Sequence, residues 1–330
     1  MRIPNSFRIA QTPTPIEFLP KFNAEIGGAN IWVKRDDLTG SVLTGNKARK
    51  LEFVIAEAAD MGAKVIMTSG GLQSNHCRST ALVCAKFGLK CHLVLRGEKP
   101  AVPDGNLLLD MLAGAEITYI PDEGYATGKP QIVDDIIADY TKQGIIAYWS
   151  PIGASNAVGS LGYMVAWDEI MQQQENMGVK FDHVVIATGS GGSFAGLIAG
   201  RAIDESDEKP QVWGVNIGKT QGYPTGPIRD ILNEIQDKYE LSFTDEASPI
   251  NVIDGFVGEG YGIPYPEEIE TIKLAARTEG LILDPVYTGK AFHAVVTRVR
   301  EGFFKRDKNI LYIHSGGLFG LFPQRDIFFK

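Results

Sequence analysis

One stretch combines a tight turn, a lysine and the start of a helix: Gly45-Asn46-Lys47-Ala48-Arg49-Lys50-Leu51-Glu52-Phe53. Leu51, Ile55 and Ala58 follow at helical spacing, which predicts an amphipathic helix over residues 47–61. In a first helical turn the helix dipole disfavours a lysine's charged form, and partial burial lowers its pKa further. A neutral amine is a nucleophile toward aldehydes. Lys47 is therefore a candidate for covalent attachment of an aldehyde, although this stretch alone is more typical of an ordinary solvated lysine.

A glycine-rich loop joins a predicted strand to a predicted helix. The apolar run over residues 184–187 leads into Thr188-Gly189-Ser190-Gly191-Gly192-Ser193-Phe194, and the helix is predicted from Ser193. In this geometry backbone N–H groups bind phosphate. No Gly-Lys-Ser or Gly-Lys-Thr follows, and Phe194 occupies the place of the third glycine of a dinucleotide-binding loop. The loop therefore fits a single phosphate, with a glycine turn that binds nothing as the alternative. Together with Lys47 it indicates pyridoxal 5'-phosphate.

The rest of the chain alternates helix and strand patterns, which is typical of the α/β class with mainly parallel sheets. In the first half, strands are predicted over 31–34, 65–68, 91–95, 116–119 and 145–148, and helices over 75–87, 106–113 and 130–142. In the second half, strands are predicted over 183–188, 211–215, 250–254 and 310–314. The helices there are predicted over 155–175 (N-capped by Ser155), 193–204, 226–239, 266–278 and 289–301. The short apolar strands fit sheets that are covered by helices on both faces.

Composition narrows the functional classes. The chain has 330 residues and a net charge of −8, which gives a nucleic-acid-binding role no electrostatic support. No apolar run is long enough to span a membrane, and residues 1–6 lack an apolar signal core, so a cytoplasmic protein is expected. The three cysteines, Cys77, Cys84 and Cys91, are expected to be free, buried thiols, and their spacing does not favour a zinc site.

Further motifs occur in one order along almost the whole chain and give it a specific resemblance. The chain resembles fold-type-II pyridoxal-phosphate enzymes of the tryptophan-synthase-β superfamily, and within them the D-cysteine desulfhydrase and aminocyclopropane-carboxylate deaminase family. The matching motifs are residues 12–16 (TPTPI), 34–37 (KRDD), 45–47 (GNK), 73–76 (QSNH), 188–192 (TGSGG), 261–264 (YGIP), 284–290 (DPVYTGK) and 314–317 (HSGG). The resemblance implies two three-layer αβα domains: a large cofactor-binding domain of residues 1–48 and 161–330, and a small inserted domain of residues 49–160. It also implies a homodimer and a small-molecule amino-acid substrate.

The resemblance assigns roles to individual residues. The catalytic set is Lys47, Ser74, Tyr261 and Tyr287, with Lys47 linked to the cofactor. The cofactor-binding set adds Asn75, Gly189, Ser190, Gly191, Gly192, Ser193, Thr288 and Ser315. A plain helix-capping role for Ser74 remains an alternative. No metal is expected: Asp36 and Asp37 resemble metal ligands, but without a third carboxylate or histidine nearby a structural ion-pair role is favoured.

Thr288 and Ser315 carry the information on specificity. The deaminase branch has an acidic residue at the position that matches Thr288 and an aliphatic residue at the position that matches Ser315. A carboxylate beside the pyridine nitrogen keeps the ring protonated and strongly electron-withdrawing, as opening a cyclopropane requires. Thiolate is a good leaving group, and its expulsion requires less electron withdrawal by the ring. The resemblance therefore favours a lyase that converts D-cysteine, or a similar β-substituted amino acid, to pyruvate, ammonia and sulfide. The alternatives are 1-aminocyclopropane-1-carboxylate deaminase and cysteate sulfo-lyase. A non-catalytic pyridoxal-phosphate-binding module is disfavoured because Lys47, Ser74 and both tyrosines are retained.

Overall fold

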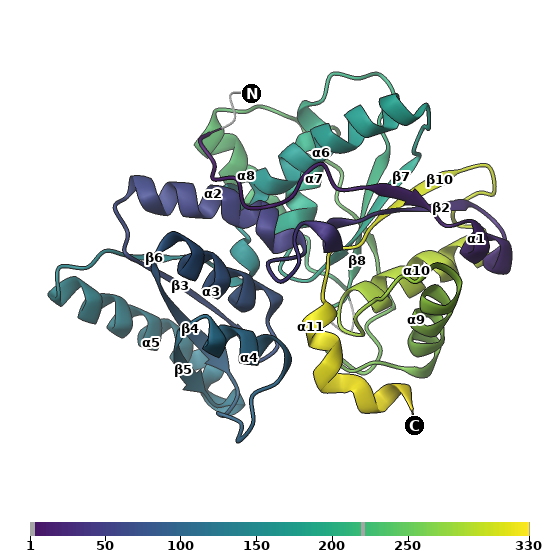
Figure 1. The fold of residues 1–330 in the computed structure, drawn as a ribbon. Helices are drawn as coiled ribbons and strands as arrows, with labels where there is room; N and C mark the ends of the chain where they lie inside the picture. Colours follow the sequence, from purple (N-terminus) through teal and green to yellow (C-terminus); the bar gives the residue numbers. More distant parts are fainter. Residues whose placement is uncertain (1–3, 219–221, 330) are drawn as a thin grey trace.

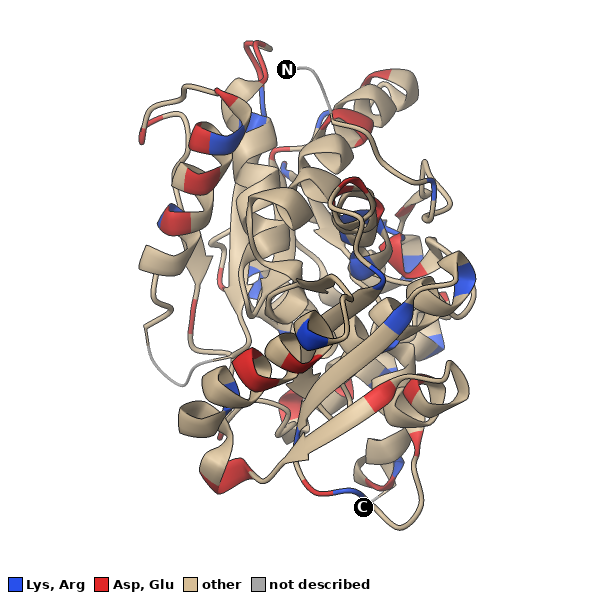
Figure 2. Ribbon diagram, turned by 90° about the vertical axis from the view of Figure 1, so that its left-hand side faces the viewer, with Lys and Arg blue, Asp and Glu red and all other residues tan. Residues whose placement is uncertain are grey.

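Two sheets, each accompanied by helices, make up the fold (Figure 1). The computed structural model describes residues 4–218 and 222–329; the start of the N-terminal segment, residues 1–3, for which no signal core is predicted, lies outside them. Within the described part of the chain, no helix has the length and apolar character needed to cross a bilayer. In Figure 2, acidic and basic residues among those described are interspersed on the same helices.

The larger sheet takes its strands from both ends of the chain. Its order is β1-β2-β10-β7-β8-β9, and all neighbours are parallel except β1 and β2. The strands are β1 (Ile16–Phe18), β2 (Asn30–Lys34), β7 (His183–Thr188), β8 (Gln211–Asn216), β9 (Asn251–Ile253) and β10 (Asn309–Ile313). Both faces of the central strands are covered: Val184, Val185 and Ile186 of β7 are each fully buried. Consecutive apolar residues suit such a strand, because its side chains alternate between two covered faces.

The smaller sheet comes from one continuous part of the chain. Its parallel order is β5-β4-β3-β6, with β3 (Val65–Gly71), β4 (Lys90–Arg96), β5 (Glu116–Ile120) and β6 (Ala147–Trp149). The helices of this part are α2 (Asn46–Asp60), α3 (Asn75–Phe87), α4 (Gly105–Leu112) and α5 (Asp122–Lys142). The predicted α/β class with mainly parallel sheets is confirmed. The domain limits, 49–160 inserted between 1–48 and 161–330, stay a prediction.

The remaining helices belong to the second half of the chain and to its first residues. They are α1 (Pro20–Ile26), α6 (Ala157–Met177), α7 (Gly192–Ile203), α8 (Gly226–Tyr239), α9 (Pro266–Glu279), α10 (Thr288–Arg300) and α11 (Leu318–Leu321), followed by a 3-10 segment, Phe322–Phe328. Short 3-10 turns also occur at Asp36–Leu38 and Ile152–Ala154. Helices α6 and α7 pack against each other and α6 also packs against α2, so the helix that carries Lys47 is held by the larger part of the molecule.

Most predicted elements lie within a few residues of the observed ones, and the differences have local causes. The helix predicted from Ser155 begins at Ala157, because the side chain of Asn156 accepts a hydrogen bond from the Gly159 amide (2.9 Å) and caps it. The cap prediction for Ser155 is therefore wrong. The Ser155 hydroxyl instead contacts the glycine loop, where it accepts from the Gly192 amide (3.1 Å) and donates to Ser190 (2.7 Å).

Candidate active site

A cavity of about 460 Å³ lies where the starts of α2, α3 and α7 converge. Helices α3 and α7 follow the carboxyl ends of β3 and β7, which is where parallel sheets commonly bind ligands. The structure brings eleven of the predicted site residues together around this cavity: Lys47, Ser74, Asn75, Gly189, Ser190, Gly191, Gly192, Ser193, Tyr261, Tyr287 and Ser315. Thr288 lies outside this set. The described lining residues include no aspartate or glutamate.

Two glycines of the loop pack too closely against neighbouring residues to carry a side chain. Gly191 has φ +90°, and a Cβ there would lie 2.2 Å from Cδ1 of Ile228. A Cβ at Gly192 would lie 2.5 Å from Nζ of Lys50 and 2.8 Å from Cα of Ser155. The loop therefore needs glycine at these two positions. Its residues line the cavity at the start of α7, where the helix dipole favours an anion. These residues fit the phosphate of pyridoxal phosphate.

Two lysines on the first turn of α2 face the same cavity. Lys47 is partly buried, and burial together with the positive charge of Arg78 lowers its pKa to about 8. Lys50 is fully buried, and its Nζ donates to the Gly153 carbonyl (2.6 Å). Burial, and then the charge of Lys47, holds the pKa of Lys50 well below its usual value. Lys47 is therefore suited to react with an aldehyde, and Lys50, which lies beside the glycine loop, is suited to pair with a phosphate.

The helix start after β3 has donors and acceptors in fixed directions. The Ser74 hydroxyl accepts from the Cys77 amide (3.2 Å), so the capping alternative is present, and its own hydrogen stays available to the cavity. The Asn75 side-chain oxygen accepts from Nδ2 of Asn106 (3.1 Å). This contact directs the amide nitrogen of Asn75 away from Asn106, and a cofactor oxygen is a suitable acceptor for it. Arg78 holds Asn106 from the other side through Oδ1 (3.2 Å).

Tyr261 and Tyr287 meet at the cavity wall. Their hydroxyls are hydrogen-bonded to each other, and their ring centroids lie 5.8 Å apart at 75°. Tyr261 comes from the loop between β9 and α9, and Tyr287 is the N-cap residue of α10. Burial, and then the neighbouring phenol, raises the pKa of Tyr287 well above its usual value. Burial raises the pKa of Tyr261 as well, so both phenols keep their protons at neutral pH.

The two residues that carry the specificity argument are placed differently. Ser315 is partly buried and lines the cavity. Thr288 is fully buried; its hydroxyl donates to Oδ1 of Asp284 (2.6 Å) and accepts from the Asp284 amide (2.8 Å). The only hydroxyl hydrogen of Thr288 is thus used inside the protein. Of the predicted hydroxyl pair, Ser315 is the member with access to a ligand.

Several residues at the cavity were not predicted. Lys50 was given no role, although its position three residues after Lys47 places both on one helix face. The Tyr223 hydroxyl donates to the Gly189 carbonyl (2.9 Å) and fixes the glycine loop, as Ser155 does from the other side. His76 also lines the cavity, where burial and then the two lysines keep its pKa well below the usual value. Two of these residues had a sequence signal: Lys50 in its helical spacing from Lys47, and His76 in the motif 73–76, where a satisfied or helix-surface histidine was favoured over a base.

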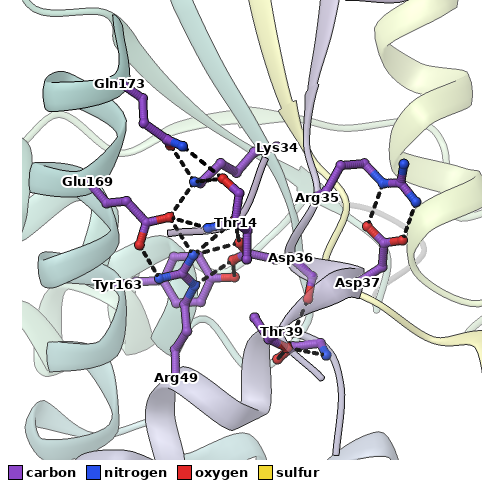
Figure 3. Close-up of polar contacts among 11 residues, drawn as sticks. Thr14, Lys34, Arg35, Asp36, Asp37, Thr39, Arg49, Tyr163, Glu169 and Gln173 are labelled. Carbon is purple, nitrogen blue, oxygen red and sulfur yellow. Dashed lines mark hydrogen bonds and ion pairs between the residues drawn. The ribbon is translucent and has the colours of Figure 1, made fainter. Parts of the chain in front are cut away.

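A buried ion cluster lies on the other side of the start of α2 (Figure 3). It consists of Thr14, Lys34, Asp36, Arg49, Tyr163, Glu169 and Gln173. Arg49 pairs with Asp36 (2.8 Å) and with Glu169 (2.9 Å), and Tyr163 donates to Asp36 (2.6 Å). Asp37 pairs with Arg35 (2.8 Å). The expectation of structural ion pairs for Asp36 and Asp37 is confirmed, and the described residues contain no group of three His, Cys, Asp or Glu side chains that could hold a metal.

Comparison with known proteins agrees with this geometry. The family model described as "Pyridoxal-phosphate dependent enzyme" matches residues 8–316. A Thermotoga maritima protein, provisionally named a 1-aminocyclopropane-1-carboxylate deaminase, is 44% identical over 94% of this chain and 96% of its own length. A Rhizobium radiobacter protein named 1-aminocyclopropane-1-carboxylate deaminase is 36% identical over 92% of each chain.

Solved structures show the same relationship. The crystal structure of an ACC deaminase homologue has a TM-score of 0.88 and 35% identity, covering 99% of this chain and 96% of that one. A hydrogen sulfide-producing enzyme from Fusobacterium nucleatum, at 17% identity and a TM-score of 0.66 over 94% of this chain and 96% of that one, shares the fold. The chain therefore belongs to the pyridoxal-phosphate-dependent enzymes, in the fold-type-II group of the aminocyclopropane-carboxylate deaminases and D-cysteine desulfhydrases.

Proposed function

We propose that the protein is a carbon–sulfur lyase that converts D-cysteine, or a similar β-substituted amino acid, to pyruvate, ammonia and sulfide. The observation that carries this proposal is the cavity wall: it presents the Ser315 hydroxyl, and none of its described lining residues is a carboxylate. A carboxylate at the ring nitrogen would be needed to hold a proton there and strengthen electron withdrawal. Expulsion of a thiolate, a good leaving group, does not require that strengthening.

Bound pyridoxal phosphate supplies the ring that accepts electrons when the substrate loses its Cα proton. The start of α3 and the Ser74 hydroxyl bind the substrate carboxylate, since a helix N-terminus favours an anion. Lys47, with a pKa of about 8, accepts the Cα proton as a neutral amine. The Tyr261–Tyr287 pair donates a proton toward the departing sulfur, because both phenols keep their protons at neutral pH. Asn75 and the loop Gly189–Ser193 hold the cofactor, with Lys50 paired to its phosphate.

The second candidate is the deamination of 1-aminocyclopropane-1-carboxylate, and the names of relatives at 36% identity or more favour it. Its ring-opening step requires the stronger electron withdrawal described above. A carboxylate near the ring would have to come from Asp284, which lies behind Thr288 and already accepts from the amides of Val286 and Tyr287 (2.9 Å each). Asp284 is therefore a structural acceptor in this site, and we rank deamination second.

The test compares products from one preparation of the loaded enzyme. We expect pyruvate and sulfide from D-cysteine, and little or no α-ketobutyrate from 1-aminocyclopropane-1-carboxylate. Cysteate is assayed in parallel, with sulfite as the diagnostic product. The Lys47→Ala variant serves as the blank for uncatalysed loss of sulfide. α-Ketobutyrate formed as fast as pyruvate would overturn the proposal in favour of deamination.

We further infer, on the same family grounds, that the enzyme is a homodimer. Light scattering of the purified protein tests this, and a mass of one 35.9 kDa chain would contradict it.

A further inference from the structure

Lys290 has an unusual environment for a lysine. It lies in α10, its side chain is fully buried, and its Nζ donates to the carbonyls of Val257 (2.5 Å), Gly260 (2.9 Å) and Ile263 (2.8 Å). An ammonium group has three N–H donors, so each is used. All three acceptors belong to one loop, residues 257–263, which connects β9 to α9. A single buried cation therefore gathers three backbone carbonyls of this loop.

Acidic side chains offset part of the cost of burying that cation. Transferring an unpaired charge from water into a protein interior is costly. Burial lowers the pKa of Lys290, while the acidic side chains of Glu268, fully buried in α9, and then of Asp284 oppose this shift and favour the charged form. The helix that presents the ammonium also begins at the N-cap residue Tyr287. The cation is thus tied to the helix start that carries one of the two phenols of the active site.

The loop that Lys290 holds carries the other phenol. Gly258 (φ +69°) and Gly262 (φ +75°) provide turns, and Gly260 pairs with Ile263 in an isolated bridge. Tyr261 lies between these two bridge residues and keeps 47% of its surface exposed, so packing around it is incomplete. The carbonyls on either side of Tyr261 in sequence point to Lys290, while the Tyr261 hydroxyl reaches Tyr287. Without Lys290 these carbonyls would lose the ammonium that they share, and the Gly260 carbonyl would keep the Ile263 amide as a donor (3.2 Å).

We propose that Lys290 is a positioning residue whose ammonium acts as an internal cation that holds loop 257–263 and thereby fixes Tyr261 against Tyr287. The proposal rests on the proposed function only for the chemical role of Tyr261. The contacts of Lys290 with the loop are independent of that role. The test therefore measures the loop and the reaction separately.

The first measurement is amide hydrogen exchange of residues 257–263 in Lys290→Ala and Lys290→Met, with and without cofactor. We expect exchange at least about tenfold faster than in the wild type, because the loop loses its anchor. Lys273→Ala is the matched control, since Lys273 is partly exposed on α9 and pairs with Glu270 (2.9 Å). Unchanged exchange in both Lys290 variants would overturn the inference. If Lys290→Ala does not fold, Lys290→Met, which preserves most of the side-chain volume, carries the measurement.

The second measurement is turnover with added alkylammonium ions. We expect kcat of Lys290→Ala to fall about 10²-fold, the usual size of a proton-transfer contribution, with a much smaller change in KM. Ethylammonium should restore at least about tenfold of this loss in Lys290→Ala but not in Lys290→Met, whose side chain fills the space. Failure of rescue, with kcat equally low in both variants, would contradict the internal-cation role.

Tyr261→Phe separates this inference from the proposed function. If Tyr261→Phe keeps full turnover while Lys290→Ala shows fast loop exchange, the loop anchor stands and the assignment of Tyr261 as a proton donor fails. If Tyr261→Phe is impaired and loop exchange in Lys290→Ala is normal, Tyr261 stands as a proton donor and the anchoring role of Lys290 fails.

Discussion

The first turn of α2 presents three basic residues, and it divides them between two regions with opposite charge balance. Arg49 enters the buried ion cluster, where Asp36 and Glu169 both pair with it (Figure 3). Lys47 and Lys50 face the cavity, where no described carboxylate pairs with either of them. The first region is neutralised within the protein, and the second keeps unbalanced positive charge. The difference indicates that the ion cluster stabilises the fold and that the cavity is suited to an anionic ligand.

The pKa shifts follow the same division. Burial disfavours the charged form of all three side chains. In the cluster, the charge of Asp36 and the hydrogen bonds of Glu169 outweigh burial and raise the pKa of Arg49. In the cavity, burial and neighbouring positive groups act together and lower the pKa of Lys47 and of Lys50. A bound phosphate would give Lys50 the counter-ion that Arg49 already has.

The largest effect is expected for Lys47→Ala, which should lower turnover at least about 10³-fold because it removes both the attachment point and the base. Borohydride reduction followed by peptide mass spectrometry should find the cofactor on Lys47 in the wild type. The rate of attachment to cofactor-free protein should rise as the pH increases through about 8, since only the neutral amine attacks an aldehyde. Finding the cofactor on Lys50 instead would reverse the roles of the two lysines.

A smaller effect, on stability alone, is expected when the cluster is broken. Glu169→Gln should lower the free energy of unfolding by about 3 kcal/mol, because Arg49 and Lys34 keep their buried charges and lose a carboxylate. Asp245→Asn is the matched control, since the pair of Asp245 with Arg229 is largely exposed and is worth about 0.5 kcal/mol. Urea unfolding measures both. Loss of cofactor affinity without loss of stability in Glu169→Gln would place Glu169 in the site instead.

The pH dependence sharpens this test. Burial opposes ionisation of Glu169, yet its bonds with Arg49 and the charges of Arg49 and Lys34 keep its pKa below the usual value. A carboxylate of this kind stabilises the fold above its unfolded pKa of about 4.3, and its contribution is lost as the pH falls through the folded pKa. The stability difference between wild type and Glu169→Gln should therefore be largest near neutral pH and shrink in acid. A difference that grows in acid would contradict the assignment.

Local patterns predicted most of the fold. The helix over 75–87 and the strand over 183–188 were predicted with their observed limits, because caps, glycines and apolar runs mark them. The elements that were missed, β1, α1 and α11, are short, and β1 depends on pairing with β2 rather than on its own sequence. Their stability comes from tertiary contacts, which periodicity does not record.

Site residues were predictable where a backbone motif marks them, and less so where a side chain arrives from a distant segment. Glycines 189, 191 and 192 and Lys47 stand in recognisable turns. Tyr223 and Ser155 reach the glycine loop through side chains from segments more than thirty residues away. The hydrogen bond from Thr288 to Asp284 could not be predicted either, since the motif 284–290 does not reveal that the threonine hydroxyl points into the protein. Membership of a motif therefore does not show whether a side chain can contact the ligand.

The last prediction concerns Lys50: substitutions in the cavity and in the ion cluster should change the free energy of unfolding in opposite directions. Lys50→Met removes a buried amine whose charged form is disfavoured by burial and which no described carboxylate pairs with, so the cofactor-free protein should gain about 1 kcal/mol of stability, in contrast to the loss in Glu169→Gln. The dissociation constant for pyridoxal phosphate should rise about tenfold to 100-fold, because a charge-assisted hydrogen bond to phosphate is worth about 1.5–3 kcal/mol. Urea unfolding of the cofactor-free protein and equilibrium titration with the cofactor measure the two quantities, and Lys86→Met, an exposed lysine on α3, is the control. Lower stability with unchanged affinity would show that Lys50 belongs with Arg49 as a structural residue, because an ammonium that served only Gly153 would stabilise the fold and leave the phosphate to the backbone of the glycine loop.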